Sequence, residues 1–448
     1  MLFTIIAFFF VLGIVVLVHE LGHFWVAKLN GICVVTFSFG LGPKLIKKRI
    51  GETEYAISAI PFGGYVKFAG ETFEDEAPDH GSEEDELNIP EHRLYRSKSP
   101  LQKMSVVAAG PVMNALSAVV LYILIAWFQG LYVTPGTVVK EVENGTPAAE
   151  AGFRPQDHIL AINDKQFRFW NDLETHVIFK EGVSSSFTVQ RGADTLVIDV
   201  TPAFNPETGY WNIGIDAPLL ARVGTVKRDG PAYRAGIRSG SVILAINDTA
   251  VVYWRELEEK IHARPGIGMS FTWEYDGTRY TKTIIPDGVD APAEGERLDV
   301  VKIGGIGIGP PYERISISFG DAVGHGFRSC YAIIAGIIQF LGKLVTGNAT
   351  MRAVGGPIKV GIMAGDMLRW GFSYLVYFIA FFSLNLTIFN LLPVLPFDGG
   401  HFVIHFFEFV SRRRMNQRVH AVLVQIGYFI LIALVIFIFF NDLLNLLR

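Results

Sequence analysis

Four long apolar runs dominate the pattern of hydrophobic and polar positions along the chain. Residues 2–18 carry no charged side chain, and no charge occurs from 104 to 139 or from 370 to 397. A helix of about 20 apolar residues crosses the roughly 30 Å hydrocarbon core of a bilayer. The pattern therefore predicts membrane spans near 2–23, 106–130, 372–392 and 421–440, the first continuing as helix to a C-cap at Gly31.

A fifth run, residues 322–344, is interrupted by Arg328 and Gln339. Basic residues follow the first span and precede the last, and four spans place both of these loops in the cytoplasm, where Lys and Arg are enriched. We therefore expect 322–344 to be an amphipathic helix on the membrane surface, with both termini outside. The N-terminal run has no basic residue before it and no small-residue cleavage site after it, so it is not expected to be a signal peptide.

Two segments of contrasting composition lie between the first and second spans. Residues 71–91 hold ten acidic side chains among twenty-one and are expected to be a disordered tether. Residues 55–68, YAISAIPFGGYVKF, alternate in the manner of β-strands around a Pro-Phe-Gly-Gly turn, which predicts a hairpin apolar enough to enter the membrane. Its edge can pair with an extended substrate; an ordinary cytoplasmic hairpin is the alternative. The expected substrate-binding residues are Ile60, Pro61, Phe62, Gly63, Gly64 and Tyr65.

The polar middle of the chain, about 135–310, contains a duplication. Residues 147–164 align without gaps on 231–248, an offset of 84, with eleven of eighteen positions identical. Trp170 and Trp254 also correspond. A period this long suits a duplicated small domain, and short β-runs with one helix after each tryptophan predict two α+β domains.

The AG…ILAIND stretch of each copy resembles PDZ domains, which bind extended peptides at an open sheet edge. The resemblance makes peptide C-termini candidate ligands of these domains. The alternative is that one or both copies are inert spacers.

Composition agrees with a membrane protein that carries polar domains. Half of the 448 residues are hydrophobic, and a net charge of −4 gives no basic field for nucleic acid. Cys33 and Cys330 form no CxxC pair and are interpreted as incidental. The expected fold class is a multidomain membrane protein with four transmembrane α-helices, a membrane-reentrant β-hairpin and two tandem PDZ-like α+β domains.

The first span ends in HELGH, which places His19 and His23 on one helix face with Glu20 beside them. Ionisable groups at membrane depth are costly, so a functional role is favoured over two histidines that only hydrogen-bond to neighbouring spans. Two neutral imidazoles one turn apart can bind one Zn²⁺, and the glutamate is placed to take a proton from a water that zinc activates.

Catalytic zinc usually takes three protein ligands, so a third is needed. The segment 385–405 is the densest source, because Pro393 and Pro396 break the third span there and Asp398 follows them. Rival ligands nearby are His401, His405 and Glu408. On chemistry alone, the choice is divided between Asp398 and His401. Two amides inside the apolar spans, Asn114 and Asn385, are expected to support the site.

HELGH, AAGPVMN (108–114), the paired PDZ-like copies and NLLPVLPFDGG (390–400) together resemble the site-2 protease family, and most closely its bacterial RseP-type members. The resemblance covers essentially the whole chain, in order. It implies that the zinc ligands are His19, His23 and Asp398, with Glu20 as catalytic glutamate and Asn390 contacting the substrate or the developing oxyanion. It moves His401, His405 and Glu408 to roles around the ligands or in packing.

The resemblance implies an intramembrane zinc endopeptidase of a bacterial inner membrane that acts in regulated proteolysis. Its substrates would be single-pass proteins, such as an anti-sigma factor already shortened by another protease, or signal-peptide remnants. The PDZ pair would lie in the periplasm as a size filter, with the active site toward the cytoplasm. Two alternatives are a PDZ membrane scaffold with a structural metal and a metal-ion transporter. Glu20 argues against the first, and the spans show no inverted repeat that would favour the second.

Domain boundaries follow from these assignments. The membrane segments are expected at 1–31 (first span), 32–103 (β segment and acidic loop), 104–132 (second span), 313–370 (surface helices), 371–410 (third span) and 411–448 (fourth span). The two PDZ-like domains are expected at 133–220 and 221–312.

Overall fold

The structure is a computed structural model whose described residues form two compact units. The described residues are 2–71, 89–134, 136–167, 169–170, 173, 182–205, 210–216, 219–292, 300–347, 355–413 and 415–446. The first unit, called here the membrane unit, comprises 1–127, 318–339 and 355–448. The second, called the repeat unit, comprises 128–317 and 340–354. Most of the expected acidic tether lies outside the described residues.

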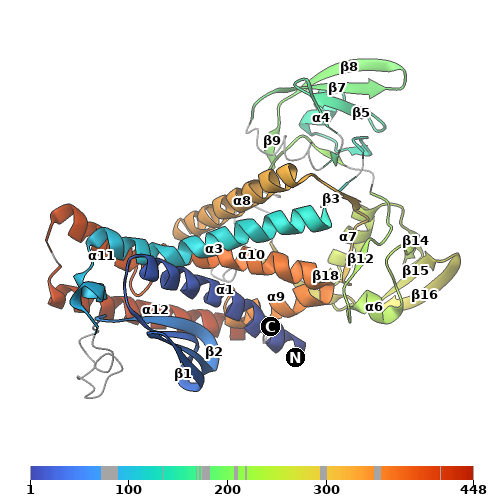
Figure 1. The fold of residues 1–448 in the computed structure, drawn as a ribbon. Coiled ribbons are helices and arrows are strands. Elements are labelled where there is room, and N and C mark those ends of the chain that lie inside the picture. The colour runs from blue at the N-terminus through green and yellow to red at the C-terminus, as the bar shows by residue number, and fades with distance from the viewer. Residues whose placement is uncertain are drawn as a thin grey trace. The chain divides into compact units, whose positions relative to one another are not determined.

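Long helices make up most of the membrane unit (Figure 1). They are α1 (Leu2–Leu29), α3 (Pro100–Gln129), α8 (Phe319–Val345), α9 (Pro357–Trp370), α10 (Phe372–Asn390), α11 (Asp398–Ser411) and α12 (Gln417–Leu446), with short 3₁₀ turns η1 (Glu91–Arg93) and η2 (Tyr95–Ser97) before α3. Among the described residues, five helices are long and apolar enough to cross a membrane: α1, α3, α8, α10 and α12. The four spans expected from sequence are among them, and α8 is the segment expected on the membrane surface.

Local signals in the sequence set the ends of the first two helices. After α1, Gly31 adopts a positive φ of 65°, and the N–H of Ile32 donates to the carbonyl of Ala27 at 2.9 Å, which closes the helix as expected. At the start of α3, Pro100 occupies the first turn, and Ser99 and Gln102 hydrogen-bond to each other's backbone N–H groups. The end of α1 and the start of α3 are therefore both set by local sequence.

The third span breaks where the prolines predicted it. Helix α10 ends at Asn390 and α11 begins at Asp398, so residues 391–397 form a connection at the end of the span. A Cβ at Gly399 would lie 2.4 Å from the carbonyl oxygens of Leu391 and Leu392, which shows how closely this connection folds onto α11. Only glycine permits that approach.

The sheet of the membrane unit differs from the expected hairpin. Its strands are β1 (Val34–Ile50) and β2 (Thr53–Phe68). Residues 36–39 of β1 pair antiparallel with 54–57 and also with 64–67, so β1 lies between the two halves of β2. The halves of residues 55–68 are therefore not hairpin partners, and that pairing was wrongly predicted. The positive φ of Gly63, 95°, marks the turn between the halves.

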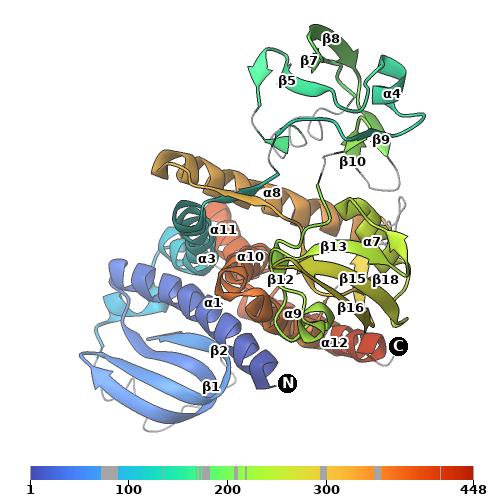
Figure 2. The ribbon, with the colours of Figure 1, turned by 90° about the vertical axis from the view of Figure 1, so that its right-hand side faces the viewer.

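The repeat unit contains two four-stranded sheets of the same topology (Figure 2). The first has the order β6-β5-β7-β8 and the second β14-β13-β15-β16. Their strands are β5 (His158–Ile162), β6 (Lys165–Gln166), β7 (Ser185–Arg191) and β8 (Asp194–Val200), then β13 (Val242–Ile246), β14 (Thr249–Ala250), β15 (Met269–Tyr275) and β16 (Thr278–Ile284). Even the register shift recurs, between Ile159 and Ala161 in one copy and between Ile243 and Ala245 in the other. The predicted duplication is therefore present as two domains with the same strand order.

Equivalent residues build the two cores. Ile159, Trp170 and Phe187 are buried in the first copy, and Ile243, Trp254 and Phe271, each 84 positions later, are buried in the second. The predicted helix after the tryptophan is α7 (Trp254–His262) in the second copy; in the first copy it lies largely outside the described residues. Short helices α4 (Pro147–Ala151) and α6 (Pro231–Ala235) also correspond.

Short strand pairs complete the repeat unit. They are β4 (Glu141–Val142) with β11 (Ile215–Asp216), β9 (Ala203–Asn205) with β10 (Tyr210–Asn212), β12 (Thr225–Val226) with β19 (Ile308–Gly309), and β17 (Asp287–Pro292) with β18 (Val300–Gly305). Strand β3 (Leu131–Val133) pairs antiparallel with β20 (Glu313–Ile315). The chain therefore enters and leaves the duplicated region through two adjacent strands.

Candidate metal centre

The metal-binding candidates of α1 lie on one face in its C-terminal half. His19 and His23 are one turn apart, and their Nε2 atoms are 3.2 Å from each other. The Nδ1–H of His23 donates to the carbonyl of Val106 on α3 at 2.8 Å. A neutral imidazole carries one proton, so this bond leaves Nε2 of His23 with a lone pair for a metal.

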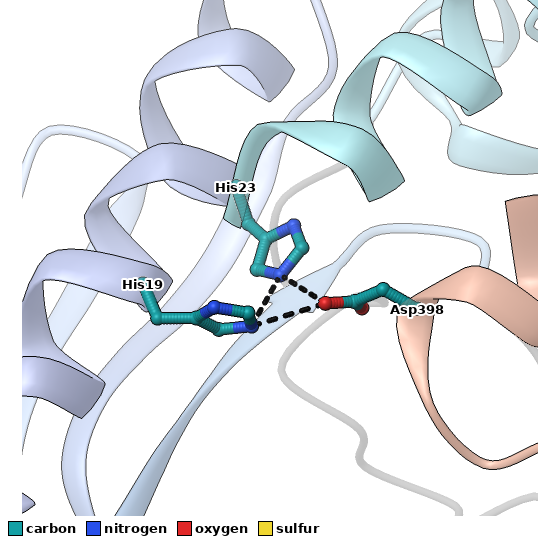
Figure 3. A group of neighbouring side chains, drawn as sticks. All are labelled: His19, His23 and Asp398. Atoms are coloured by element: carbon teal, nitrogen blue, oxygen red, sulfur yellow. Dashed lines mark hydrogen bonds and ion pairs between the residues drawn. The ribbon is translucent and has the colours of Figure 1, made fainter. Parts of the chain in front are cut away.

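Asp398, in the first turn of α11, brings the third ligand atom (Figure 3). Its Oδ2 lies 3.1 Å from Nε2 of His19 and 3.6 Å from Nε2 of His23. Ligand atoms about 2.0–2.1 Å from a tetrahedral Zn²⁺ stand about 3.3 Å apart. The three observed separations straddle that value, so one ion fits between these atoms.

The rival ligands point elsewhere. His405 lies between Glu408, 3.1 Å from its Nδ1, and the hydroxyl of Tyr95, 3.2 Å from its Nε2. His401 faces the ring of His420, with the ring centroids 6.2 Å apart. Among the described residues, His19, His23 and Asp398 form the one group of three side chains able to hold a metal. Of the two candidates left open by sequence chemistry, Asp398 is the one that the structure brings together with His19 and His23.

Two further observations agree with a metal at this point. Oδ2 of Asp398 is buried and accepts no hydrogen bond from the described residues, as expected of an atom that binds a cation instead. On α3, a Cβ added to Gly110 would lie 2.4 Å from Nε2 of His23 and 2.7 Å from Nε2 of His19. Glycine at 110 therefore keeps open the space between the ligands.

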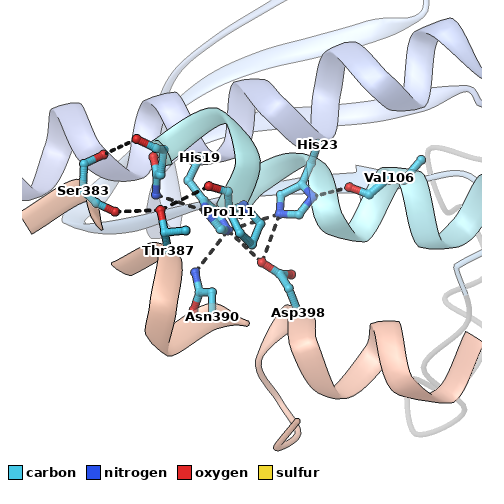
Figure 4. A network of polar contacts seen from close by, with 9 residues as sticks. His19, His23, Val106, Pro111, Ser383, Thr387, Asn390 and Asp398 are labelled. Carbon is cyan, nitrogen blue, oxygen red and sulfur yellow. Dashed lines mark hydrogen bonds and ion pairs between the residues drawn. The ribbon is translucent and has the colours of Figure 1, made fainter. Parts of the chain in front are cut away.

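Two asparagines expected from sequence contact this group. The amide nitrogen of Asn390, at the end of α10, is 3.4 Å from Nε2 of His19 (Figure 4). Asn114, fully buried on α3, places its amide nitrogen 3.3 Å from the other nitrogen of the same ring, Nδ1. Asn385 does not join them, because its amide donates to the carbonyl of Phe381 on its own helix at 2.9 Å.

Hydroxyl groups that were not predicted fasten α10 to α3. Ser383 donates to the carbonyl of Asn114 at 3.1 Å, and Thr387 donates to the carbonyl of Pro111 at 3.1 Å. Within α3, Ser117 also donates to the carbonyl of Asn114, at 2.8 Å. The signal was available in the sequence, since Ser383, Thr387 and Asn390 follow the 4-then-3 spacing of one helix face. This face of α10 therefore places Asn390 beside the candidate ligands.

A model of peptidase family M50 matches residues 7–434. The chain belongs to peptidase family M50. The match spans α1, α3, α10 and α11, the four helices that carry the ligands and their neighbours. As an M50 peptidase, the protein is an enzyme, which decides against the scaffold and transporter alternatives.

Curated relatives cover the same length. A protein of Neisseria meningitidis serogroup A named as a zinc metalloprotease is 31% identical over 462 residues, 99% of each chain. The regulator of sigma-E protease RseP of Escherichia coli is 30% identical over 459 residues, 98% of each chain. A solved PDZ domain of an SdrC-like protein from Listeria monocytogenes matches 19% of this chain and 90% of its own, with 21% identity and a TM-score of 0.17.

In this M50 chain the end of β2 lies beside the glutamate of HELGH. A Cβ added to Gly64 would be 3.1 Å from Cγ of Glu20 and 3.4 Å from Val16. The segment 64–68 pairs with β1 on one side, and no strand of the described chain pairs with its other side. The strand that carries this unpaired edge therefore passes Glu20.

The remaining residues predicted for substrate binding lie near the same turn of β2. Ile60 is half exposed, at 49%, and Gly63 and Tyr65 are partly buried. The side chains of Pro61 and Phe62 lie outside the part of the chain that the structure describes.

Proposed function

We propose that this M50 peptidase is a zinc endopeptidase that hydrolyses a peptide bond in the transmembrane segment of single-pass membrane proteins. The observation that carries the proposal is the spacing of Nε2 of His19, Nε2 of His23 and Oδ2 of Asp398, 3.1 to 3.6 Å apart, within a unit built of apolar helices. Zinc is the cofactor, as in the relative named a zinc metalloprotease.

The residues around the ligands have separate roles. Bound zinc supplies Lewis acidity, which lets water ionise near neutral pH. Glu20 takes the proton of the attacking water and gives it to the leaving amine, as general base and then general acid. Asn390 donates its amide N–H to the negative charge that develops on the carbonyl oxygen of the cleaved bond.

The edge of the sheet offers backbone hydrogen-bond partners, which a transmembrane helix lacks once it is unwound. The carbonyl and N–H groups of a helix satisfy one another, and once unwound in lipid they need new partners. The free edge of 64–68 offers such partners beside Glu20, so an extended substrate is held there by strand addition. Holding a substrate by strand addition needs an edge and a turn. It does not require the two halves of residues 55–68 to pair as a hairpin.

The proposed cellular setting rests on the resemblance to bacterial relatives and on the charge of the loops between the helices. The basic loops after α1 and before α12 favour a cytoplasmic position for the active-site end, which places the repeats and both termini on the periplasmic side of a bacterial inner membrane. In that arrangement α8 lies on the membrane surface. We propose a pre-cleaved anti-sigma factor as substrate, with signal-peptide remnants as a second class; the support is the 30% identity to a protein named regulator of sigma-E protease.

The base is tested by Glu20→Gln in the full chain reconstituted in liposomes with a single-pass substrate. The glutamine keeps the shape of the side chain but cannot accept the proton, so cleavage should fall at least 100-fold while zinc content stays at one per chain. Zinc content by elemental analysis and cleavage by gel mobility are the two measurements.

Glu91→Gln is the matched control, because it removes an exposed carboxylate of the same unit. It should cleave like the unaltered protein. Cleavage by Glu20→Gln at the control's rate would show that the assigned base is wrong, and retained zinc in His19→Ala would show that the assigned metal site is wrong.

We also propose that the two repeats act as PDZ-like domains that exclude substrates with a bulky outer domain. Leu131 pairs with Ile315 and Val133 with Glu313, so residues 134–312 can be replaced by a two-residue Asn-Gly turn without separating β3 from β20. The shortened enzyme should cleave trimmed and untrimmed substrates at similar rates, whereas the full chain should prefer the trimmed one. If the shortened enzyme cleaves the trimmed substrate and still rejects the untrimmed one, the repeats are not the filter.

A further inference from the structure

We propose that Asn114 is a positioning residue that accepts a hydrogen bond from Nδ1–H of His19 and thereby fixes the tautomer that presents Nε2 to zinc. The inference rests on the metal site of the proposed function. It adds a second residue of α3 to the control of the ligands that α1 carries.

His23 provides the internal reference. Its Nδ1 lies 2.8 Å from the carbonyl oxygen of Val106, and a carbonyl can only accept, so the proton of His23 is on Nδ1. Its Nε2 then faces Oδ2 of Asp398 with a free lone pair. One backbone group of α3 thus determines the tautomer of one ligand.

His19 faces the group of ligands through the same ring nitrogen. Its Nε2 is 3.1 Å from Oδ2 of Asp398 and 3.2 Å from Nε2 of His23, so Nδ1 points away from the metal position. The side chain opposite that Nδ1 is Asn114, at 3.3 Å. A neutral His19 that binds through Nε2 carries its proton on Nδ1 and needs an acceptor there.

The amide of Asn114 has an unused acceptor. Its Oδ1 is buried and has no hydrogen-bond partner among the described residues, while its Nδ2 is the atom toward the ring. An N–H facing an N–H forms no hydrogen bond. A half-turn of the amide about Cβ–Cγ exchanges two groups of nearly equal size and gives both Oδ1 and Nδ1–H a partner.

The backbone of Asn114 is held in place independently of its side chain. Ser117 and Ser383 both donate to its carbonyl oxygen, at 2.8 and 3.1 Å, so the residue is anchored to α3 and α10. Gly110, one turn earlier, lets the imidazoles approach α3. Removing the amide therefore removes one hydrogen bond to His19 without releasing the helix that carries it.

The test compares the zinc affinity of three full-length variants by competition with a coloured chelator. Asn114→Leu keeps the volume and loses the acceptor, and it should bind zinc 10- to 100-fold more weakly, the usual effect of losing a partner of a ligating histidine. Asn114→Asp keeps an acceptor and should restore the affinity. Asn30→Ala, which removes another amide bonded between α1 and α3, to Val26 O and Ser105, should leave the affinity unchanged.

A second readout reports the ligands directly. Co²⁺ occupies tetrahedral zinc sites and absorbs visible light, so its spectrum should change in Asn114→Leu and return in Asn114→Asp. Unchanged affinity and spectrum in Asn114→Leu would overturn the inference, as would equal losses in the leucine and aspartate variants. His19→Ala distinguishes a failure of the metal site from a failure of the role of Asn114. Zinc retained by His19→Ala would refute the metal site itself. Zinc lost by His19→Ala but bound normally by Asn114→Leu would refute only the role of Asn114.

Discussion

At the scale of single residues, the sequence specified the two candidate ligands of α1 more sharply than the third candidate. HELGH fixes the face and spacing of His19 and His23 within one helix, so local geometry is enough. Asp398 and His401 share the first turn of α11, and which of them faces α1 depends on how 391–397 folds onto Gly399. That contact is tertiary, and no local rule predicts it.

Gly110→Ala is a residue-scale test of the space between the ligands. The added Cβ would stand 2.4 Å from Nε2 of His23, closer than side chains tolerate, so a ligand must move. A displacement of about 1 Å at a catalytic group can cost about 100-fold, and we expect a loss of that size in cleavage together with weaker zinc binding.

Gly336→Ala is the comparison for this prediction, because a Cβ there meets nothing within 4 Å on α8. Alanine favours a helix over glycine by about 1 kcal/mol, so both variants should fold. Equal activity of the two variants would mean that the space at Gly110 is not used.

Asn390→Ala tests the amide proposed to stabilise the oxyanion. Loss of such a donor typically lowers kcat by about 100- to 1,000-fold, and the zinc content should be unaffected because Asn390 is not a ligand. The measurement is kcat and KM for a fluorescent transmembrane peptide in detergent. Asn385→Ala, on the same helix, should keep its kcat; a similar loss there would restore the supporting role expected from sequence.

At the scale of elements, spans and helix breaks were predictable while strand partners were not. Apolar length and proline positions are local signals, and α1, α3, α10 and α12 lie where they indicated. The Pro-Phe-Gly-Gly turn is also local, and it led to a hairpin that does not form. Strand pairing is set by residues outside the segment, here 36–39 of β1, which occupy the place between the two halves of β2.

Thr387→Val tests how α10 is held on α3. The change keeps the branched shape and removes the hydroxyl that donates to the carbonyl of Pro111. A hydrogen bond between membrane helices contributes about 0.6 kcal/mol, so we expect a modest loss of thermal stability. Because Asn390 lies three residues further on the same face, kcat should also fall severalfold. No change in either quantity would show that packing alone aligns the two helices.

At the scale of the whole molecule, the duplication was evident in the sequence, but the divergence of the two copies was not. The first copy buries Asp157, whose Oδ1 accepts from Nε of Arg191 at 2.7 Å. The second copy has Ser241 and Tyr275 at the equivalent positions. One repeat therefore depends on an ion pair that the other lacks.

This difference predicts that acid weakens the first repeat selectively. Burial by itself raises the pKa of Asp157, but the hydrogen bonds from Arg191 and Arg154 outweigh it and lower that pKa in the folded protein. The ion pair therefore stabilises the fold above the unfolded pKa of about 3.9, and this stabilisation is lost as the pH falls through the lower folded pKa. Hydrogen exchange of the full chain between about pH 6 and pH 3 should show β5 and β7 losing protection before β13 and β15.

Arg191→Met checks the cause. It leaves the buried Asp157 with only the hydrogen bond from the backbone N–H of Arg154 and should destabilise the first repeat by about 3 kcal/mol at neutral pH, with the second repeat unaffected. Equal acid sensitivity of the two repeats in the unaltered protein would contradict this account.

The pairing of β3 with β20 has a consequence for how such a chain can change. Since insertions are tolerated best where the two ends of the added segment meet, a gene fragment encoding everything from Thr134 to Tyr312 can be exchanged as one cassette. A foreign domain whose own termini are neighbours would join the same two backbone positions. Under the filter role proposed for the repeats, recombination at these two strands would change which substrates are admitted and leave the catalytic residues of the helices unchanged.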